Sequence, residues 1–327
     1  MKSDNEGVAA MKDVASLYDP EGLDDIYQPL KDAGLILDYK PILKTAGEDE
    51  LIDKLSGYSY IIAAGENYTA RVIRTLAQNG LKLIVRMGIG YDNVDTHTAR
   101  ECGVDVANTP GANAEAVAEQ ALMLTLCAAR SGGKDNIAMH QGIWEASRPV
   151  DLFGCTVGLV GFGSIAAKFA ALIRPLAGKI LAYDPYPNAK RVEELNVEIV
   201  SFERLITESD VVSLHLPLTE QTEGLFNEAV FRKMKSGAIL INTSRGSIIN
   251  ENALVIALKE GKLHAAGLDV FCTEPLPPDS PLRLLDNCVM SPHDASMSNA
   301  AFRSMTAAVV RSILAKVNGT NDINIVN

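Results

Sequence analysis

The sequence predicts an α/β protein with two doubly wound parallel sheets, and three observations support this fold class. Short apolar runs alternate with amphipathic runs from residue 14 onward, which is the rhythm of βαβ units. A second series of the same kind begins at residue 156. The length of 327 residues leaves room for two domains of about 150 residues, each able to bury a core.

The first series contains four predicted strands and three predicted helices. The strands lie at 14–18, 35–39, 60–64 and 81–86, and the helices at 22–33, 49–56 and 69–79. Because strands and helices alternate, we expect a parallel sheet with helices on both faces. The second series has predicted strands at 156–160, 180–184, 211–214, 238–242 and 288–290.

Two longer helices are predicted outside this alternation. The segment 113–130 is apolar on nearly every face, and its only charges are Glu115, Glu119 and Arg130. We therefore expect it to be buried on most sides, in a core or in a subunit interface. The amphipathic segment 298–317 follows the last strand and is expected to cross back to the first unit. The N-terminal domain would then contain both ends of the chain.

Residues 156–184 carry the pattern of a Rossmann dinucleotide-binding unit. An apolar strand leads into Gly161-x-Gly163-x-x-Ala166, which opens a helix, and the next strand ends at Asp184. The first glycine allows a tight turn, the second allows close approach of the pyrophosphate, and the helix N-terminus binds that anion. Glycine turns alone are common packing devices, but the strand and Asp184 make this one specific. A carboxylate at this place accepts from the ribose hydroxyls and repels a 2′-phosphate, so we expect NAD rather than NADP.

Composition excludes several classes of function. A 47% hydrophobic content, 22% charged residues and no apolar run of about 18 residues indicate a globular protein without a membrane span. The net charge of −11 argues against nucleic acid and anionic membranes as partners. The cysteines are scattered without C-x-x-C pairs, and no basic, apolar leader opens the chain, so a reducing, cytoplasmic location is expected. No H-x-x-x-H pattern or carboxylate cluster predicts a metal site. Trp144, the only tryptophan, is expected to be a packing anchor.

Three later patches each place an ionisable residue after an apolar run. Arg245 follows 239–241, Glu274 follows 266–271, and His293 follows 289–290. Ligands of doubly wound sheets bind at the carboxyl ends of the strands. A guanidinium can hold a carboxylate, an imidazole can transfer a proton, and a neighbouring carboxylate favours the imidazolium form. Each residue alone has a structural explanation, but together after a dinucleotide fold they indicate hydride transfer to a 2-keto acid.

These features and several others resemble the NAD-dependent D-isomer-specific 2-hydroxyacid dehydrogenase family, which contains D-3-phosphoglycerate, D-lactate and D-glycerate dehydrogenases. The resemblance covers about residues 60–318. Besides the Gly161 turn, the matching segments are RMGIGYDNVD (86–95), NTPG (108–111), VAE (117–119), YDP (183–185), HLPLT (215–219), NTSRG (242–246), LDVF with EP (268–275) and PH (292–293).

The resemblance implies the catalytic roles. Arg245 would bind the substrate carboxylate and carbonyl. His293 would be the acid in reduction and the base in oxidation, and Glu274 would pair with it. The implied fold is a Rossmann NAD-binding domain over 105–295 and a flavodoxin-like substrate-binding domain over 1–104 plus 296–327. A homodimer built around the 113–130 helix is also implied.

The resemblance further implies the ligand contacts. In addition to Arg245 and His293, the substrate would contact Gly88, Ile89 and Gly90. Ser164 and Ile165 would lie on the pyrophosphate, 215–217 on the adenine side, and Thr243 and Asp269 on the nicotinamide side. The full set of expected NAD contacts is Gly161, Gly163, Ser164, Ile165, Asp184, Pro185, His215, Leu216, Pro217, Thr222, Thr243, Ser244 and Asp269.

The chain departs from the family pattern at two places. Asp294 follows the expected catalytic histidine where the family usually has an aliphatic residue, and we expect its carboxylate to face solvent. Around Ala63 and Ala64 the phosphoglycerate enzymes typically carry an Arg-Ser pair that helps to hold the phosphate. Its absence, with Glu66 close by, argues against a phosphorylated substrate. The chain is also expected to lack the regulatory domain of those enzymes.

The leading interpretation is an oxidoreductase acting on a small D-2-hydroxy acid or 2-keto acid of the phosphoglycerate, glycerate, glyoxylate or lactate type. The substrate within this class and the physiological direction stay open. One alternative is an NAD(H)-sensing, corepressor-like binding protein with little turnover. Formate oxidation is disfavoured because those relatives carry glutamine at the position of Glu274.

Overall fold

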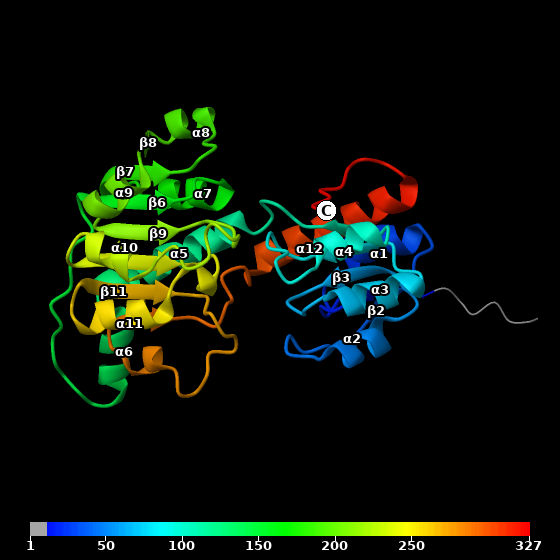
Figure 1. Cartoon of the computed structure of the whole chain (residues 1–327), viewed down its shortest axis with the longest axis horizontal. Coiled ribbons are helices and arrows are strands. Elements are labelled where there is room, and N and C mark those ends of the chain that lie inside the picture. The colour runs from blue at the N-terminus through cyan, green and yellow to red at the C-terminus, as the bar shows by residue number, and fades with distance from the viewer. Residues whose placement is uncertain (1–11) are drawn as a thin grey trace, which may run out of the picture. The chain divides into compact units, whose positions relative to one another are not determined.

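The computed structural model describes residues 12–327, which form two compact units (Figure 1). Unit 1 runs to Asn113 and resumes at Asn299–Asn327, and unit 2 is Ala114–Ser298. Every strand pair is parallel, in one five-stranded and one seven-stranded sheet. The predicted α/β class with two parallel sheets is therefore confirmed.

Unit 1 has a sheet of order β2-β1-β3-β4-β5, which is the flavodoxin-like order. Its strands are β1 (Lys12–Ser16), β2 (Leu37–Tyr39), β3 (Tyr58–Ala63), β4 (Leu83–Arg86) and β5 (Asp105–Ala107). Its helices are α1 (Asp24–Asp32), α2 (Glu48–Leu55), α3 (Ala70–Gln78), α4 (Thr96–Glu101) and α12 (Asn299–Asn318).

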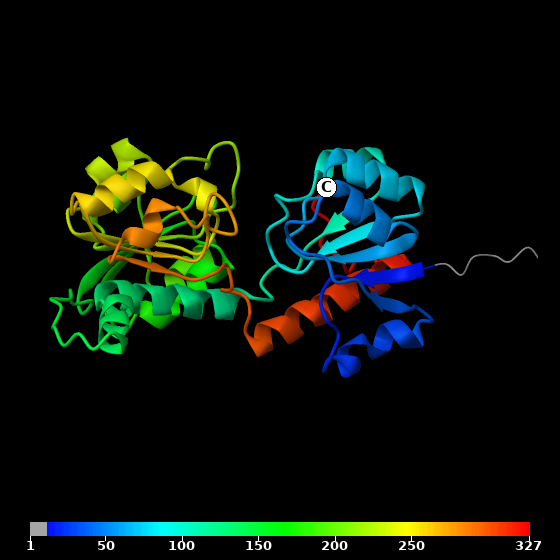
Figure 2. The same ribbon diagram turned by 90° about the horizontal axis from the view of Figure 1, so that it is seen from below.

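Helix α12 packs on the sheet of unit 1, against strands that are distant from it in the sequence. Met305, Val309 and Ile313 of α12 are buried in one cluster with Val14 and Leu83. Figure 2 shows this orange-to-red helix beside the blue strands that begin the described chain. The segment after α12 continues along β5, where the amide of Val326 donates to the carbonyl of Val106 at 2.8 Å. Both ends of the described chain therefore build unit 1.

Unit 2 has a sheet of order β12-β11-β10-β9-β6-β7-β8. Its strands are β6 (Cys155–Val160), β7 (Ala177–Tyr183), β8 (Glu198–Ile199), β9 (Val211–Leu214), β10 (Ala238–Asn242), β11 (Leu263–Leu268) and β12 (Cys288–Met290). Its helices are α5 (Ala114–Ala129), α6 (Gly132–His140), α7 (Ser164–Ile173), α8 (Ala189–Glu194), α9 (Phe202–Glu208), α10 (Glu228–Lys233) and α11 (Glu251–Lys259), with 3₁₀ turns at Gly246–Ile248 and Pro281–Leu284. The strand order reverses between β6 and β9, and ligands of such sheets bind at this switch point.

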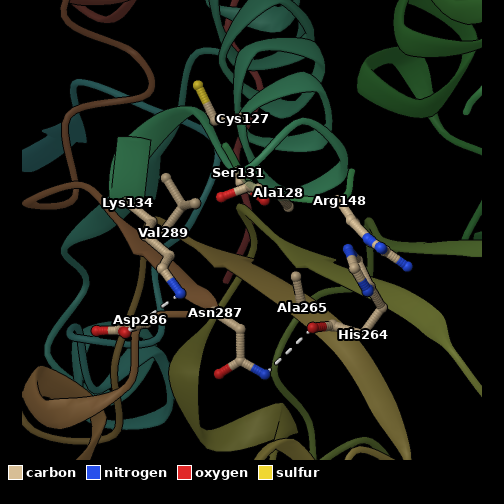
Figure 3. A pocket seen from close by; sticks show the side chains of 11 residues that line it. Cys127, Ala128, Ser131, Lys134, Arg148, His264, Ala265, Asp286, Asn287 and Val289 are labelled. Carbon is tan, nitrogen blue, oxygen red and sulfur yellow. Dashed lines mark hydrogen bonds and ion pairs between the residues drawn. The ribbon is translucent and has the colours of Figure 1, made fainter. Parts of the chain in front are cut away.

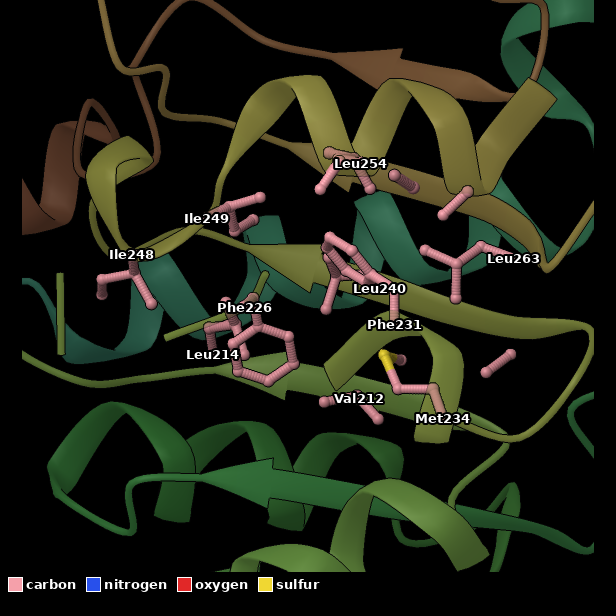
Figure 4. Packing of buried hydrophobic residues seen from close by; sticks show 14 of the residues in the cluster. Val212, Leu214, Phe226, Phe231, Met234, Leu240, Ile248, Ile249, Leu254 and Leu263 are labelled. Atoms are coloured by element: carbon pink, nitrogen blue, oxygen red, sulfur yellow. The ribbon is translucent and has the colours of Figure 1, made fainter. Parts of the chain in front are cut away.

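A large apolar cluster fixes the strands that lead to the candidate site. Val212 of β9 and Leu240 of β10 are fully buried, and Leu254 of α11 and Phe231 of α10 pack with them (Figure 4). Truncating such a buried leucine or phenylalanine to alanine typically costs about 2–5 kcal/mol. The core therefore holds the carboxyl ends of these strands rigidly in place.

Helix α5 is buried on most sides, as its composition predicted. Leu124 lies so close to β11 that a Cβ on Gly267 would be 2.9 Å from the Cβ of Leu124. The segment that follows is different, because Trp144 is 86% exposed within the chain and Phe153 is 82% exposed. The expectation that Trp144 is a packing anchor is therefore wrong. No helix within residues 12–327 is long and apolar enough to cross a membrane.

Candidate active site

The turn after β6 needs glycine at its first position. Gly161 has a φ of 88°, a backbone conformation that side chains disfavour. A Cβ there would also lie 2.6 Å from the carbonyl oxygen of His215. The turn and the end of β9 are thus in backbone contact, as close strand packing at a switch point requires.

The second glycine of the turn leaves open space at the start of α7. A Cβ built on Gly163 would meet nothing within 4 Å. No side chain caps this helix, and its first turn holds no acidic residue. Unpaired amides at an uncapped helix N-terminus attract anions, so this part of unit 2 fits a diphosphate.

Asp184 lies at the end of β7 and contacts the same turn. Its carboxylate accepts hydrogen bonds of 2.7 Å from the amide of Phe162 and of 2.7 Å from the amide of Tyr186. The carboxylate is thereby fixed beside the expected pyrophosphate site, where it fits a ribose. The contact with Phe162 was not predicted from the sequence.

His215 follows β9 and is held as a neutral ring. Burial lowers its pKa to about 3. Its Nε2 lies 2.9 Å from Oγ of Ser213, and its ring is 5.6 Å from that of Phe169 on α7. In the following loop, the hydroxyl of Thr222 donates to the carbonyl of Pro217 at 2.7 Å. Thr222 therefore closes the loop that begins with His215, Leu216 and Pro217.

A buried hydroxyl without a partner lies at the end of β10. Oγ1 of Thr243 makes no hydrogen bond among the described residues. Such a group costs about 1–3 kcal/mol unless a ligand or water satisfies it. Next to it, Asn242 accepts from Ser244 at 2.7 Å and donates to the carbonyl of Arg245 at 2.9 Å. This turn shapes the strand end that presents Arg245, and the orphan hydroxyl fits a polar group of a bound cofactor.

The ends of β10 and β11 are pressed together just beyond Arg245. A Cβ on Gly246 would lie 1.9 Å from the carbonyl carbon of Phe271, so only glycine fits there. Phe271 in turn donates its amide to the carboxylate of Glu274 at 3.0 Å. Arg245 itself is half-buried and donates to the carbonyl of Ser244 at 2.7 Å.

Glu274 and His293 are in direct contact. Nδ1 of the histidine lies 2.6 Å from Oε2 of the glutamate. The side chain of Glu274 is 17% exposed and that of His293 is 38% exposed. The ring is therefore oriented by a carboxylate that is itself held by a backbone amide, and the histidine side chain remains partly exposed. This is the arrangement of a proton-transfer histidine.

Arg245, Glu274 and His293 follow β10, β11 and β12, which are adjacent in the sheet. The glycine turn and Asp184 follow β6 and β7 of the same sheet. All these segments leave the carboxyl ends of parallel strands, and so they emerge at one edge of unit 2.

Asp269 follows β11 and is fully buried, and its carboxylate accepts hydrogen bonds from the segment that carries His293. It accepts a hydrogen bond of 2.6 Å from the hydroxyl of Ser291 and hydrogen bonds of 3.1 Å from the backbone amides of Asp294 and Ala295. Asp294 is exposed, as expected. Partial burial, followed by the charge of Asp269, raises the pKa of the Asp294 carboxyl.

In unit 1, the loop 88–90 is anchored through its carbonyl groups. The carbonyl of Gly88 accepts from the amide of Thr109 at 3.0 Å, and that of Ile89 from the side chain of Asn108 at 2.7 Å. Arg86 donates to the carbonyl of Gly90 at 3.0 Å. This fixes the orientation of the peptide planes, and hence of the amides expected to hold a carboxylate.

Glu66 lies in the loop just after β3, close to the position where the expected Arg-Ser pair is missing. It is only 2% exposed, and it accepts from the amide of Ala64 at 3.0 Å. Burial raises the pKa of this carboxyl, and the positive charges of Arg86 and Lys44 act in the opposite direction. A buried carboxyl group thus lies in the loop that follows β3.

A cavity of about 260 Å³ in unit 2 lies away from this chemistry (Figure 3). Its lining includes His264, at the start of β11, and Asn287, just before β12. The side-chain amide of Asn287 donates to the carbonyl of His264 at 3.1 Å. These residues lie at the amino ends of the strands, so the cavity does not belong to the edge with Glu274 and His293. Residues 12–327 contain no cluster of three or more His, Cys, Asp or Glu placed to hold a metal.

Comparison with known proteins identifies the family. Residues 122–295 match the family described as D-isomer specific 2-hydroxyacid dehydrogenase, NAD binding domain. The chain belongs to this family of NAD-dependent oxidoreductases. The resemblance and the predicted cofactor are thereby confirmed.

Three relatives cover much of the chain. A D-3-phosphoglycerate dehydrogenase of Archaeoglobus fulgidus is 37% identical over 85% of this chain and 53% of its own length. A glyoxylate reductase of Korarchaeum cryptofilum is 41% identical over 76% of each chain. A hydroxypyruvate reductase of Thermotoga maritima is 42% identical over 77% of this chain and 82% of its own. The chain thus spans about half of the phosphoglycerate enzyme but most of the two reductases.

Solved structures agree with this fold. A Thermus thermophilus protein superposes with a TM-score of 0.86 at 34% identity, over 96% of this chain and 100% of the other. A Staphylococcus aureus NAD-dependent formate dehydrogenase in complex with NAD gives 0.84 at 28% identity, over 97% and 99%.

Proposed function

We propose that this protein transfers a hydride between NAD(H) and a small, unphosphorylated D-2-hydroxy acid or its 2-keto form. The observation that carries the proposal is the 2.6 Å contact between His293 and Glu274. It lies at the sheet edge that also carries the dinucleotide turn. The similarity to a glyoxylate reductase and a hydroxypyruvate reductase over most of their lengths supports the reaction class.

NAD(H) supplies or accepts the hydride, and the chain's own residues do the rest. Arg245 holds the substrate carboxylate and carbonyl with its planar fork of donors. His293 gives a proton to the carbonyl oxygen in reduction and takes it back in oxidation. Glu274 keeps the ring oriented and stabilises its charged form.

The other residues of the site are assigned to parts of NAD and to the substrate carboxylate. We assign the uncapped start of α7, with Ser164 and Ile165, to the pyrophosphate, and Asp184 with Pro185 to the adenosine ribose. His215 lines the adenine side, and its neutral ring suits an uncharged base. In unit 1, the amides of Ile89 and Gly90 bind the substrate carboxylate.

Glu66 supports an unphosphorylated substrate. A phosphate carries nearly two negative charges and is usually held by arginine or lysine donors. Here the strand end presents Ala63 and Ala64, with the buried carboxyl of Glu66 beside them. The nearby guanidinium of Arg86 already donates to the carbonyls of Ala63 and Gly90. Glyoxylate and hydroxypyruvate fit this surrounding better than phosphohydroxypyruvate does.

We also propose a cytoplasmic homodimer formed through the α5 region. Met123 and Leu126 of α5 are partly exposed, and the segment after it exposes further large apolar side chains, namely Ile137, Met139, Ile143, Trp144 and Phe153. Exposed large apolar side chains that recur along one stretch of chain would be covered in a subunit interface. The five cysteines are all free, which suits a reducing compartment.

A screen of NADH oxidation tests the proposal. The purified protein is assayed with glyoxylate, pyruvate, hydroxypyruvate, phosphohydroxypyruvate and bulkier 2-keto acids, with His293→Gln as the control for background. We expect turnover with a small unphosphorylated acid and little with phosphohydroxypyruvate. Tight NADH binding without turnover on any acid would instead indicate the NAD(H)-sensing binding protein.

A further inference from the structure

The segment that carries His293 is hydrogen-bonded to the buried carboxylate of Asp269. Asp269 accepts hydrogen bonds from the backbone amides of Asp294 and Ala295, which directly follow the histidine, and from the hydroxyl of Ser291. His293 itself has a φ of 56°, an unfavourable conformation for a residue with a side chain. The hold by Asp269 therefore maintains a backbone conformation that the segment would not favour alone.

A residue of helix α5 completes this arrangement. Nε2 of Gln120 donates to Oγ of Ser291 at 2.9 Å, and the same hydroxyl donates to Asp269 at 2.6 Å. A serine hydroxyl has one proton and rotates freely unless its acceptor sites are engaged. By occupying a lone pair of Ser291, Gln120 directs the hydroxyl proton toward Asp269.

The same side-chain nitrogen of Gln120 also lies close to Asp294. Nε2 of Gln120 lies 3.5 Å from Oδ1 of Asp294. Asp294 and Asp269 are both acidic, so their mutual repulsion would push the segment away from its anchor. The amide dipole of Gln120 offsets part of this repulsion without adding a charge.

We propose that Gln120 is a positioning residue for His293. It acts through Ser291 and Asp269 to fix the segment 291–295, and so it sets the distance between the imidazole and the reacting carbonyl. A misplacement of about 1 Å by a remote change can cost about 100-fold in rate. The inference rests on the proposed function for its kinetic consequence, but its structural consequence can be measured separately.

The test uses Gln120→Met, which keeps the length of the side chain and removes its donors. We expect kcat with NADH and the preferred keto acid to fall by about tenfold or more, with KM changed less and NADH affinity within about twofold. The matched control is Glu119→Met on the same helix turn, whose exposed side chain makes no hydrogen bond in the described structure. This control should leave kcat unchanged.

Two further measurements separate positioning from a general loss of stability. Ser291→Ala should lower kcat similarly, and the double variant should lose no more than the worse single variant, because both act on one hydrogen-bonded chain. The ring N–H of His293 bonded to Glu274 should give an NMR resonance that disappears in Glu274→Gln. In Gln120→Met this proton should exchange with water faster.

A kcat within twofold of the wild type, additive losses in the double variant, or unchanged exchange of the His293 proton would each overturn the inference. Should the wild type itself turn over no keto acid, the proposed function fails, and the exchange measurement still decides the role of Gln120.

Discussion

The carboxylate of Asp184 accepts a hydrogen bond of 2.7 Å from the amide of Phe162. Phe162 lies between the two glycines of the dinucleotide turn, so Asp184 supports the turn as well as the expected ribose site. A substitution of Asp184 therefore has two effects, and a pair of variants can separate them.

Asp184→Asn removes the charge and keeps an oxygen that can accept from Phe162. We expect its preference for NAD over NADP to fall by about tenfold or more, because the repulsion of a 2′-phosphate is lost. Asp184→Ala should lose the same preference and also about 1 kcal/mol of stability, since the amide of Phe162 loses its acceptor. Kinetics with both cofactors and thermal unfolding measure the two effects. An unchanged cofactor ratio in both variants would contradict the assignment of Asp184.

Arg245→Ala should lower kcat/KM for the keto acid by about 100-fold or more, because the substrate carboxylate loses its paired donors. NADH binding, followed by fluorescence, should change little. Arg245→Lys keeps the charge but not the planar fork, and should restore only part of the activity. An equal loss of NADH binding and turnover would move Arg245 from the substrate to the cofactor.

His293→Gln and Glu274→Gln should each reduce turnover at neutral pH by about 10²–10⁴-fold. Because the two side chains form one hydrogen-bonded unit, the double variant should be little worse than His293→Gln alone. Steady-state rates of the three variants test this. Independent, multiplying losses would show that Glu274 acts on something other than the histidine.

Glu66→Gln should stabilise the protein at neutral pH. Burial raises the pKa of the Glu66 carboxyl in the folded state, so folding favours the protonated form. The wild type therefore loses stability as pH rises from its unfolded pKa, about 4.3, through the raised folded value. We expect a higher Tm for Glu66→Gln at pH 7.5 and a vanishing difference near pH 4. A variant that is less stable at pH 7.5 would show that Arg86 and Lys44 outweigh burial.

Trp144→Ser should weaken the proposed dimer. The side chain is 86% exposed in the single chain, and large aromatic groups in interfaces often contribute most of the binding energy. Sedimentation at low micromolar concentration should show a shift toward monomer. Tyr186→Ser is the matched control, because Tyr186 is 92% exposed but lies on the loop after β7. A wild type that is monomeric throughout this range would refute the dimer.

Much of the fold could be predicted because hydrophobic periodicity is strong in the buried strands. Strands β9, β10 and β12 begin and end where the pattern placed them. Strand β5 has only three residues, too few for periodicity to show. Helix α4 has the polar sequence THTARE, and α6 buries no residue, so neither has an apolar face that a pattern could reveal.

The candidate site could be predicted only in part, for a physical reason. Strand ends and the resemblance placed Arg245, Glu274 and His293, because the topology of a parallel sheet brings its strand ends together. The hydrogen bonds from Gln120 to Ser291 and from Phe162 to Asp184 depend on how a helix and a turn dock onto the sheet. Local sequence patterns do not predict how a helix or a turn packs on a sheet, so these two hydrogen bonds could be found only in the structure.

The position of α12 in unit 1 affects the order in which the two units can fold during synthesis. Unit 2 is a continuous stretch of chain, whereas the sheet of unit 1 needs Met305, Val309 and Ile313 to cover one of its faces. During synthesis these side chains leave the ribosome about 200 residues after the last strand of that sheet, Asp105–Ala107. Unit 2 can therefore fold before unit 1, whose sheet keeps one apolar face exposed until α12 has been synthesised.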